Sequence, residues 1–259
     1  MMDSFASGVK YECLLFDMDD TLYPMSSGIN LACRKNIQDY MLHHLKIEES
    51  QVPKMCLDLY KEYGTTMAGL KALGFEFDDD EFHANVHGTL PYETLKPDPL
   101  LRHLLLSMPQ RKIIFTNADK AHVAKVLSRL GLEDCFDGVI CFETLNPPVE
   151  DNEENGDSNL RRRVLCKPSL EAMEAVIRIV KIDPKKTIFF DDSARNVSAG
   201  KAVGFRTVIV GSSAVVPGAD VALESIHNIK EALPEIWEGG DGQLDSVIPS
   251  TSVETIVLA

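Results

Sequence analysis

The segment from residue 13 to residue 22 constrains the fold of this chain more than any other. It opens with four consecutive apolar residues, and three carboxylates, Asp17, Asp19 and Asp20, follow almost at once. A continuous apolar run of this kind predicts a strand buried on both faces, as in a parallel sheet. Open α/β sheets bind their ligands at the carboxyl ends of such strands. Side chains two residues apart point the same way in extended backbone, so Asp17 and Asp19 need a cation nearby or a proton on one carboxyl group.

The composition is that of an ordinary soluble globular protein, with 44% hydrophobic and 25% charged residues among 259. That length suits one large domain, or one domain that carries a smaller insertion. The net charge of −14 argues against nucleic acid as a partner, because nucleic-acid binding needs a basic face. An anionic substrate is not excluded, since a metal ion and one lysine can reverse the sign of the charge inside a cleft.

The six cysteines are scattered and form no CxxC pair, which favours a reduced intracellular compartment. Residues 1–11 contain neither the basic segment nor the apolar stretch of a signal peptide. No apolar run approaches the roughly 20 residues that a membrane helix needs. We therefore expect a cytoplasmic protein that contacts no membrane, and the sequence leaves its oligomeric state open.

The segment between residues 26 and 91 predicts helices and contains no convincing strand. We expect residues 25–91 to form a helical cap, inserted after the first strand and lying over its end. Residues 1–24 and 92–237 would then form the core. The predicted cap helices cover 29–45, 51–64, 65–73 and 81–86.

From Arg111 onward, predicted strands alternate with predicted helices. This alternation is typical of an α/β protein with a doubly wound parallel sheet, whose equivalent strand ends gather on one edge. The strands are expected at 111–117, 138–142, 187–192, 206–210 and 220–223, and the helices at 100–108, 118–130, 167–180 and 194–203. Pro168 is well placed for the first turn of its helix. The composition of residues 147–163, five acids before three arginines, predicts an acidic flexible loop, and residues 238–259 predict a loose tail.

Polar residues follow three of the predicted strands, and one lysine stands at the start of a helix. They are Asp17 and Asp19, Thr116 and Asn117, Asp191 and Asp192, and Lys167. If the strands are parallel neighbours, these groups converge on one cleft, where four carboxylates need positive charge. One Mg²⁺ meets that need, because it takes oxygen ligands and keeps waters that a phosphate can replace. Lys167 adds a positive charge for a phosphoryl oxygen, and Thr116 adds a hydrogen-bond donor.

These residues resemble the four motifs of the haloacid dehalogenase superfamily of phosphohydrolases. The motifs are the Asp-Met-Asp-Asp-Thr-Leu run from Asp17, Thr116-Asn117, Lys167-Pro168 and Asp191-Asp192, in matching order across about 13–211. The helical insertion resembles the first cap class of that superfamily. A narrower similarity is to the pyrimidine 5′-nucleotidases and their plant and fungal relatives. It rests on Asp191-Asp192-Ser193 with Asn196, and on the segments 95–98 and 115–118.

The resemblance implies a role for each matching residue. Asp17 would be the nucleophile that forms an aspartyl-phosphate, and Asp19 would be the general acid and base. Thr116, Asn117 and Lys167 would bind the substrate phosphate. The Mg²⁺ ligands would be Asp17, Asp19 through its main-chain carbonyl, Asp192, and Asp191 either directly or through water. Asn196 stands where the typical pattern has a further Asp.

The expected activity is that of a Mg²⁺-dependent phosphomonoesterase acting on a small phosphate ester. A nucleoside 5′-monophosphate, pyrimidine preferred, is the expected substrate. A phosphatase for another metabolite such as a sugar phosphate, or a phosphomutase, is the alternative. The superfamily's dehalogenases lack the second Asp, so Asp19 favours phosphoryl transfer. A receiver-like signalling module is disfavoured by the cap, and an inactive scaffold by the presence of every chemical residue.

Two histidines, His83 and His87, have the i, i+4 spacing that can bind zinc on a helix. No Glu follows the first of them, so the HExxH pattern is not met. A packed or solvated helix face is therefore the favoured interpretation. Aromatic residues such as Tyr23 and Tyr92 are candidates for a base-binding pocket under the cap, although most aromatics of this region are expected to be core.

Overall fold

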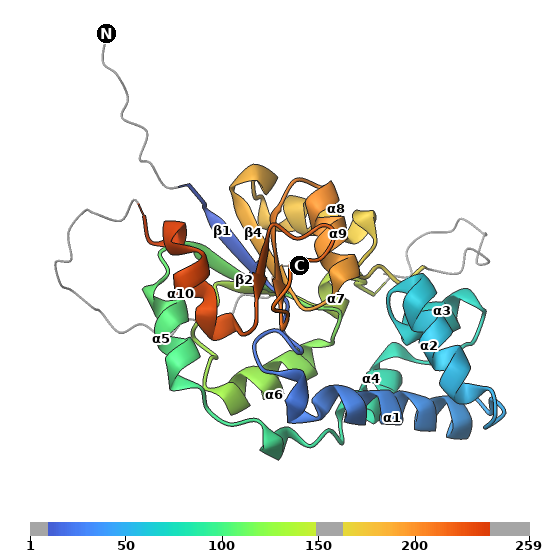
Figure 1. Ribbon diagram of the computed structural model, residues 1–259. Coiled ribbons are helices and arrows are strands. Elements are labelled where there is room, and N and C mark those ends of the chain that lie inside the picture. Colours follow the sequence, from blue (N-terminus) through green and yellow to red (C-terminus); the bar gives the residue numbers. More distant parts are fainter. Residues whose placement is uncertain (1–9, 149–162, 239–259) are drawn as a thin grey trace, which may run out of the picture.

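The computed structural model describes residues 10–148 and 163–238 (Figure 1). Its centre is a six-stranded sheet in which every neighbouring pair is parallel, in the order β3-β2-β1-β4-β5-β6. The strands are β1 (Cys13–Phe16), β2 (Arg111–Phe115), β3 (Gly138–Ile140), β4 (Thr187–Asp191), β5 (Arg206–Val210) and β6 (Val221–Leu223). This arrangement confirms the predicted doubly wound α/β fold. Apart from their edge residues, the predicted acidic loop (147–163) and tail (238–259) lie outside the described residues.

The first strand lies at the centre of the sheet, between β2 and β4. Phe16, its last residue, pairs with Ile114 of β2 and with Phe190 of β4. Because all three strands run in the same direction, they end at the same edge of the sheet within about one residue of each other. The polar residues that follow them are therefore brought together by the register.

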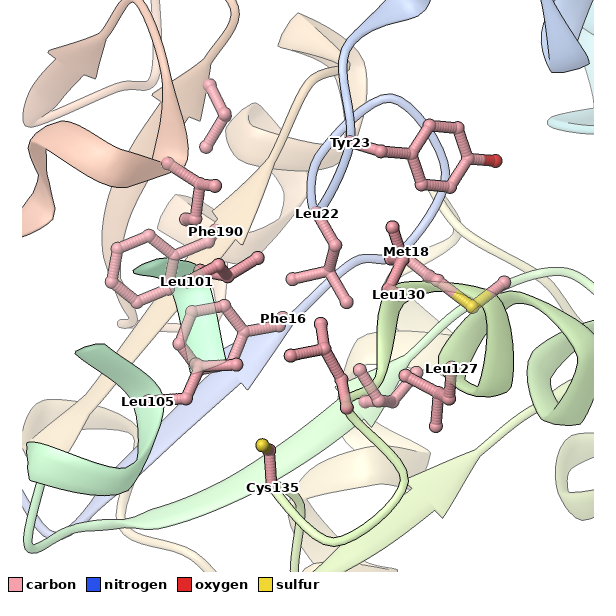
Figure 2. Close-up of a cluster of buried hydrophobic side chains, with 14 of the residues drawn as sticks. Phe16, Met18, Leu22, Tyr23, Leu101, Leu105, Leu127, Leu130, Cys135 and Phe190 are labelled. Carbon is pink, nitrogen blue, oxygen red and sulfur yellow. The ribbon is translucent and has the colours of Figure 1, made fainter. Parts of the chain in front are cut away.

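Alternate residues of the central strands face opposite layers of helices. Leu14 and Phe16 pack with α5 (Pro99–Ser107), α6 (Lys120–Leu130) and α10 (Ile229–Ala232). Leu15 packs on the other face, with α8 (Leu170–Val180) and α9 (Ala194–Ala202). Figure 2 shows the first of these layers, in which the rings of Phe16 and Phe190 stack with centroids 4.6 Å apart. Burial on both faces explains why the strand is apolar at every position.

Four helices lie between β1 and β2 in the sequence. They are α1 (Ile29–His43), α2 (Val52–Tyr63), α3 (Thr66–Ala72) and α4 (Asp79–His87). Their apolar side chains form a cluster separate from the two sheet layers, joined from the core by Phe142. In Figure 1 these helices gather to one side of the sheet, in blue and cyan. The exact bounds of a cap domain, 25–91, stay a prediction.

Most predicted boundaries differ from the observed ones by one or two residues, and at two of those that are wrong local capping gives the reason. The third strand ends at Ile140, because Phe142 begins a short helix, α7 (Phe142–Leu145), in which Thr144 Oγ1 accepts a hydrogen bond from Cys141 N. Lys167 and Pro168 do not open α8. Ser169 is its N-cap, accepting a hydrogen bond from Ala172 N, and the helix begins at Leu170.

Within the described ranges, the helices fall short of the length and apolar character that crossing a membrane would require.

Candidate active site

Lys167 is the hub of the predicted site. Its Nζ donates hydrogen bonds to Asp17 Oδ1 (2.7 Å), to Asp191 Oδ2 (2.8 Å) and to the carbonyl oxygen of Phe115 (2.7 Å). These partners come from the ends of β1, β4 and β2, so one side chain joins three strand ends. The lysine is only 1% exposed, and its charge is balanced by carboxylates that are themselves buried.

The carboxylates around Lys167 outnumber its single charge. Oxygen atoms of Asp17, Asp191 and Asp192 lie within 4.8 Å of one another. Burial raises the pKa of Asp17 to about 7, against the opposing charge of Lys167. Burial and the charges of Asp17 and Asp191 raise the pKa of Asp192 to about 8. A set of oxygen atoms with an excess of negative charge fits a hard cation such as Mg²⁺.

The two neighbouring aspartates at the end of β4 have different surroundings. Asp191 is fully buried, and its oxygens accept hydrogen bonds from Ser193 N (2.9 Å), from Asn196 Nδ2 (3.0 and 3.1 Å) and from Lys167. Asp192 is partly exposed. Protein donors thus already surround Asp191, whereas Asp192 keeps part of its surface exposed to solvent. Asn196, which replaces an expected Asp, serves here as a donor to Asp191.

Of the two residues that follow β2, Asn117 binds the main chain of Lys167 and Thr116 keeps a hydroxyl hydrogen free for the site. Asn117 clasps the main chain of Lys167: its Oδ1 accepts from Lys167 N (2.8 Å) and its Nδ2 donates to Lys167 O (3.0 Å). Thr116 is 1% exposed, and its Oγ1 accepts a hydrogen bond from Ala118 N (3.1 Å). That bond leaves the hydroxyl hydrogen of Thr116 for another acceptor. The side chain of Asn117, in contrast, is committed to Lys167.

Asp17 and Asp19 follow β1 but have different hydrogen-bond partners. Thr21 Oγ1 donates to Asp17 Oδ2 (3.0 Å), whereas Asp19 Oδ1 is bound by the hydroxyl of Tyr23 and by His122 Nε2 (2.7 Å). Burial opposes the charge of Asp19, but the charge of His122 and the hydrogen bonds from His122 and Tyr23 outweigh it and lower its pKa to about 2.

His122 is held in its protonated form by its partners. The hydroxyl of Tyr92 donates to the carbonyl of His87 (3.0 Å), so it can only accept from His122 Nδ1 (2.7 Å). His122 Nε2 meets the carboxylate of Asp19, so both ring nitrogens act as donors. Burial would lower the pKa of His122, but the carboxylate of Asp19 outweighs burial and raises it. Sequence reasoning missed His122; the one signal was a histidine among the inward-facing apolar residues of its helix.

The C-terminal end of α2 contacts the segment that carries Lys167 and the first turn of α9, which follows Asp192. Arg195 donates hydrogen bonds to the carbonyls of Tyr60 (3.1 Å) and Lys61 (2.7 Å). Cys166 Sγ donates to the carbonyl of Tyr63 (3.3 Å). Gly64 follows directly, with φ +92°, and a Cβ there would lie 2.4 Å from the carbonyl oxygen of Lys167. Close approach of two backbones therefore positions the lysine.

Gly64→Ala is expected to destabilise the protein and to reduce its activity. The left-handed backbone costs about 1–2 kcal/mol for a residue with a Cβ. The clash with Lys167 adds roughly 1–3 kcal/mol and displaces the amine. Gly28→Ala is a matched control, because Gly28 has φ +83° and nothing within 4 Å of an added Cβ. Thermal unfolding and initial rates of both variants measure the difference; equal losses would contradict a role for the contact with Lys167.

Comparison with known proteins identifies the family to which this chain belongs. Residues 11–204 match the family model for haloacid dehalogenase-like hydrolases, so the chain belongs to that family. The resemblance expected from the four motifs is thereby confirmed at this level.

The chain is also similar to particular proteins. It is 27% identical over 204 residues to "Phosphate metabolism protein 8" of Saccharomyces cerevisiae, a match that covers 75% of this chain and only 60% of that protein. Among solved structures it resembles a HAD phosphatase from Thermococcus onnurineus, with TM-score 0.53 and 18% identity, covering 85% and 96% of the two chains. It likewise resembles the L-2-haloacid dehalogenase of Xanthobacter autotrophicus, with TM-score 0.51 and 16% identity, covering 85% and 97%. A phosphatase and a dehalogenase match alike, so the fold alone does not choose the reaction.

Proposed function

We propose that the protein is a Mg²⁺-dependent phosphomonoesterase that works through an aspartyl-phosphate on Asp17. The observation that carries the proposal is the joint placement of Lys167, Asp17 and Asp191 at three strand ends. Asp19 favours phosphoryl transfer over dehalogenation. It supplies a second carboxyl group where the dehalogenases of the superfamily have none, and proton transfer to an alkoxide needs such a group.

Asp17 would attack the phosphorus atom, and the bond to the leaving alkoxide would break. Lys167 would then bind a phosphoryl oxygen with the hydrogens of its amine, and Thr116 would donate its hydroxyl to another. The side chain of Asn117 would contribute by holding the main chain of Lys167.

Asp19 would deliver the proton that the leaving alkoxide needs. The Asp19–His122 pair holds one proton between two buried or half-buried groups, and Tyr23 fixes the orientation of the carboxylate. In the second half of the reaction, Asp19 would accept a proton from the water that cleaves the aspartyl-phosphate. His122 would supply the first proton through Asp19 and take back the second, while Tyr23 would act as a positioning residue.

The residues present fit a magnesium ion. Asp17 and Asp192 would hold it with carboxylate oxygens and Asp19 with its main-chain carbonyl, while Asp191 would orient the site. When bound, Mg²⁺ supplies positive charge that neutralises the carboxylates and the transferring phosphoryl group. The elevated pKa values of Asp17 and Asp192 support this assignment, because both carboxylates need a counter-charge to ionise together.

We further propose a nucleoside 5′-monophosphate, pyrimidine preferred, as the substrate. The residues Asp191-Asp192-Ser193 with Asn196 support it, through their similarity to the pyrimidine 5′-nucleotidases. The yeast relative is named for phosphate metabolism, which supports a phosphate ester more broadly. A sugar phosphate phosphatase or a phosphomutase would use the same core residues.

Phosphate release from a panel of phosphate esters tests the function. We expect pyrimidine nucleoside 5′-monophosphates to give the highest kcat/KM, with activity lost in EDTA and restored by Mg²⁺. Sugar phosphates and purine nucleotides serve as comparison substrates. If the good substrates include no nucleotide, the proposed substrate is wrong but the proposed phosphatase activity stands. No phosphate release from the whole panel, or turnover that ignores EDTA, would remove the enzymatic proposal.

A further inference from the structure

A second group of potential metal ligands lies outside the four-motif site. His83 and His87 come from α4, one turn apart, and Asp119 is the N-cap of α6. The three side chains offer one nitrogen or oxygen each, and these atoms all lie within 4.8 Å of one another. We call these three residues the His-His-Asp cluster. It joins a helix of the insertion to a helix of the core.

Asp119 is oriented by the helix that it caps. Its Oδ2 accepts hydrogen bonds from Ala121 N (3.1 Å) and His122 N (3.3 Å). Its Oδ1 is thereby directed at the histidines: it is hydrogen-bonded to His87 Nδ1 and lies 3.8 Å from His83 Nδ1. A carboxylate whose second oxygen is fixed by main-chain donors is the arrangement seen around protein metal ligands.

His83 lacks the partners that a buried histidine normally has. It is 8% exposed, and neither ring nitrogen has a hydrogen-bond partner within 10–148 and 163–238. Its ring lies against Phe142, with centroids 4.6 Å apart, and near the ring of His87, 5.5 Å away. An unpaired buried polar group costs roughly 1–3 kcal/mol, and a charged ring would cost more. The ring is therefore neutral, and a neutral imidazole has one nitrogen lone pair with which it can bind a metal.

The ligand types select the metal. Two imidazoles and one carboxylate suit zinc, whereas Mg²⁺ takes oxygen ligands and retains its waters. Zinc bound at about 2.0–2.1 Å in tetrahedral geometry would separate its ligand atoms by roughly 3.3–3.5 Å. The contact of 3.8 Å is close to that spacing. The hydrogen bond between His87 and Asp119 is shorter than that spacing, so the metal would replace the shared proton and move the two atoms apart.

We propose that His83, His87 and Asp119 form a zinc-binding site that links α4 to the N-terminus of α6. Binding releases the proton shared by His87 and Asp119, and no electron transfer is involved. The site is separate from the carboxylates that would hold Mg²⁺, and its ligands differ in kind. Because His122 lies one turn beyond Asp119, zinc also fixes the helix end from which His122 reaches Asp19.

Zinc titration of the full-length, chelator-treated protein in excess Mg²⁺ tests the proposal. We expect one equivalent of Zn²⁺ to bind by calorimetry and to raise Tm. His83→Phe keeps a ring against Phe142 but removes the nitrogen ligands, so it should weaken zinc binding at least about tenfold. His43→Phe, at an exposed position of α1, is the matched control and should bind like the wild type.

Two further measurements locate the metal. Asp192→Asn, which alters the carboxylate site, should retain zinc, and X-ray absorption of the wild-type complex should show two imidazole ligands. That spectrum needs no variant, so it decides the question even if His83→Phe fails to fold. An all-oxygen shell, loss of zinc in Asp192→Asn, or undiminished binding in His83→Phe would each overturn the proposal. So would the absence of zinc binding to the wild type.

Discussion

Asp17→Asn is expected to abolish phosphate release, with a fall in kcat of about a thousandfold or more, as for other nucleophiles of covalent catalysis. The amide of asparagine has nearly the shape of the carboxylate but is not nucleophilic. No aspartyl-phosphate can then form, so neither half of the reaction proceeds. Initial rates with the best substrate of the panel measure the loss, and acid-quenched samples with labelled substrate report whether phosphate is bound to the protein.

Asp20→Asn is the matched control for this variant. Asp20 lies in the same loop, with φ 59°, a backbone conformation that asparagine tolerates better than most residues. Its Oδ2 accepts a hydrogen bond from Asn30 Nδ2 (2.8 Å), and it has no part in the proposed chemistry. We expect a loss of less than about tenfold, because only a hydrogen bond changes. If Asp17→Asn is as active as the wild type, Asp17 is not the nucleophile.

The sheet could be predicted from the sequence because each strand has a recognisable pattern of apolar residues. Strands buried on both faces are apolar at every position, and parallel connections are long enough to show their helices. Parallel direction then fixes where the polar ends gather, so the meeting of Asp17, Asp191 and Lys167 followed from the fold. The ends of elements were harder. Ile140 and Leu170 are boundaries set by hydrogen bonds of one or two side chains, which periodicity does not record.

The partners of Asp19 could not be predicted in the same way. His122 is 103 residues from Asp19 in the sequence, and Tyr92 reaches His122 from the segment that precedes α5. Contacts of this kind depend on how loops and helices from distant parts of the chain pack at the edge of the sheet. The clasp of Lys167 by Asn117, across 50 residues, has the same origin. Sequence motifs indicated the candidate reacting groups, while the side chains that orient them could be identified only from the packing.

The same distinction applies to the two histidines of α4. Their spacing on a helix could be read from the sequence, and a packed helix face was the favoured interpretation. The structure does place them on a packed face, and Asp119 lies against that face. No local sequence pattern connects residues 83 and 87 with residue 119, because Asp119 is the N-cap of a different helix, α6.

Lys167→Met is expected to have the largest effect on stability. The methionine would fill much the same space, but Asp17 and Asp191 would be left buried without their partner. Breaking a buried ion pair in this way typically costs about 3–5 kcal/mol. Phosphate release should also fall below detection, because the phosphoryl contact is lost. Denaturant unfolding at pH 8 without Mg²⁺ measures the first effect, and initial rates measure the second.

Lys186→Met is the matched control. Lys186 also forms a short ion pair, 2.6 Å to Glu12 Oε1, but both side chains are about half exposed. Exposed pairs contribute about 0.2–1 kcal/mol, so this variant should unfold nearly like the wild type. Similar losses in both variants would contradict the conclusion that burial makes the ion pairs of Lys167 essential for stability.

The pH dependence of Lys167→Met separates an unpaired charge from a simple packing defect. The pKa of Asp17 is already raised to about 7 in the native protein, and removing the opposing lysine raises it further. A carboxyl group whose folded pKa exceeds its unfolded value of about 3.9 binds more protons in the folded state between those two values. The folded state therefore loses stability as the pH rises through that window. The deficit of the variant relative to wild type should shrink from pH 8 to pH 5, and Lys167→Met/Asp191→Asn should recover part of it at pH 8; a deficit independent of pH would instead indicate lost packing.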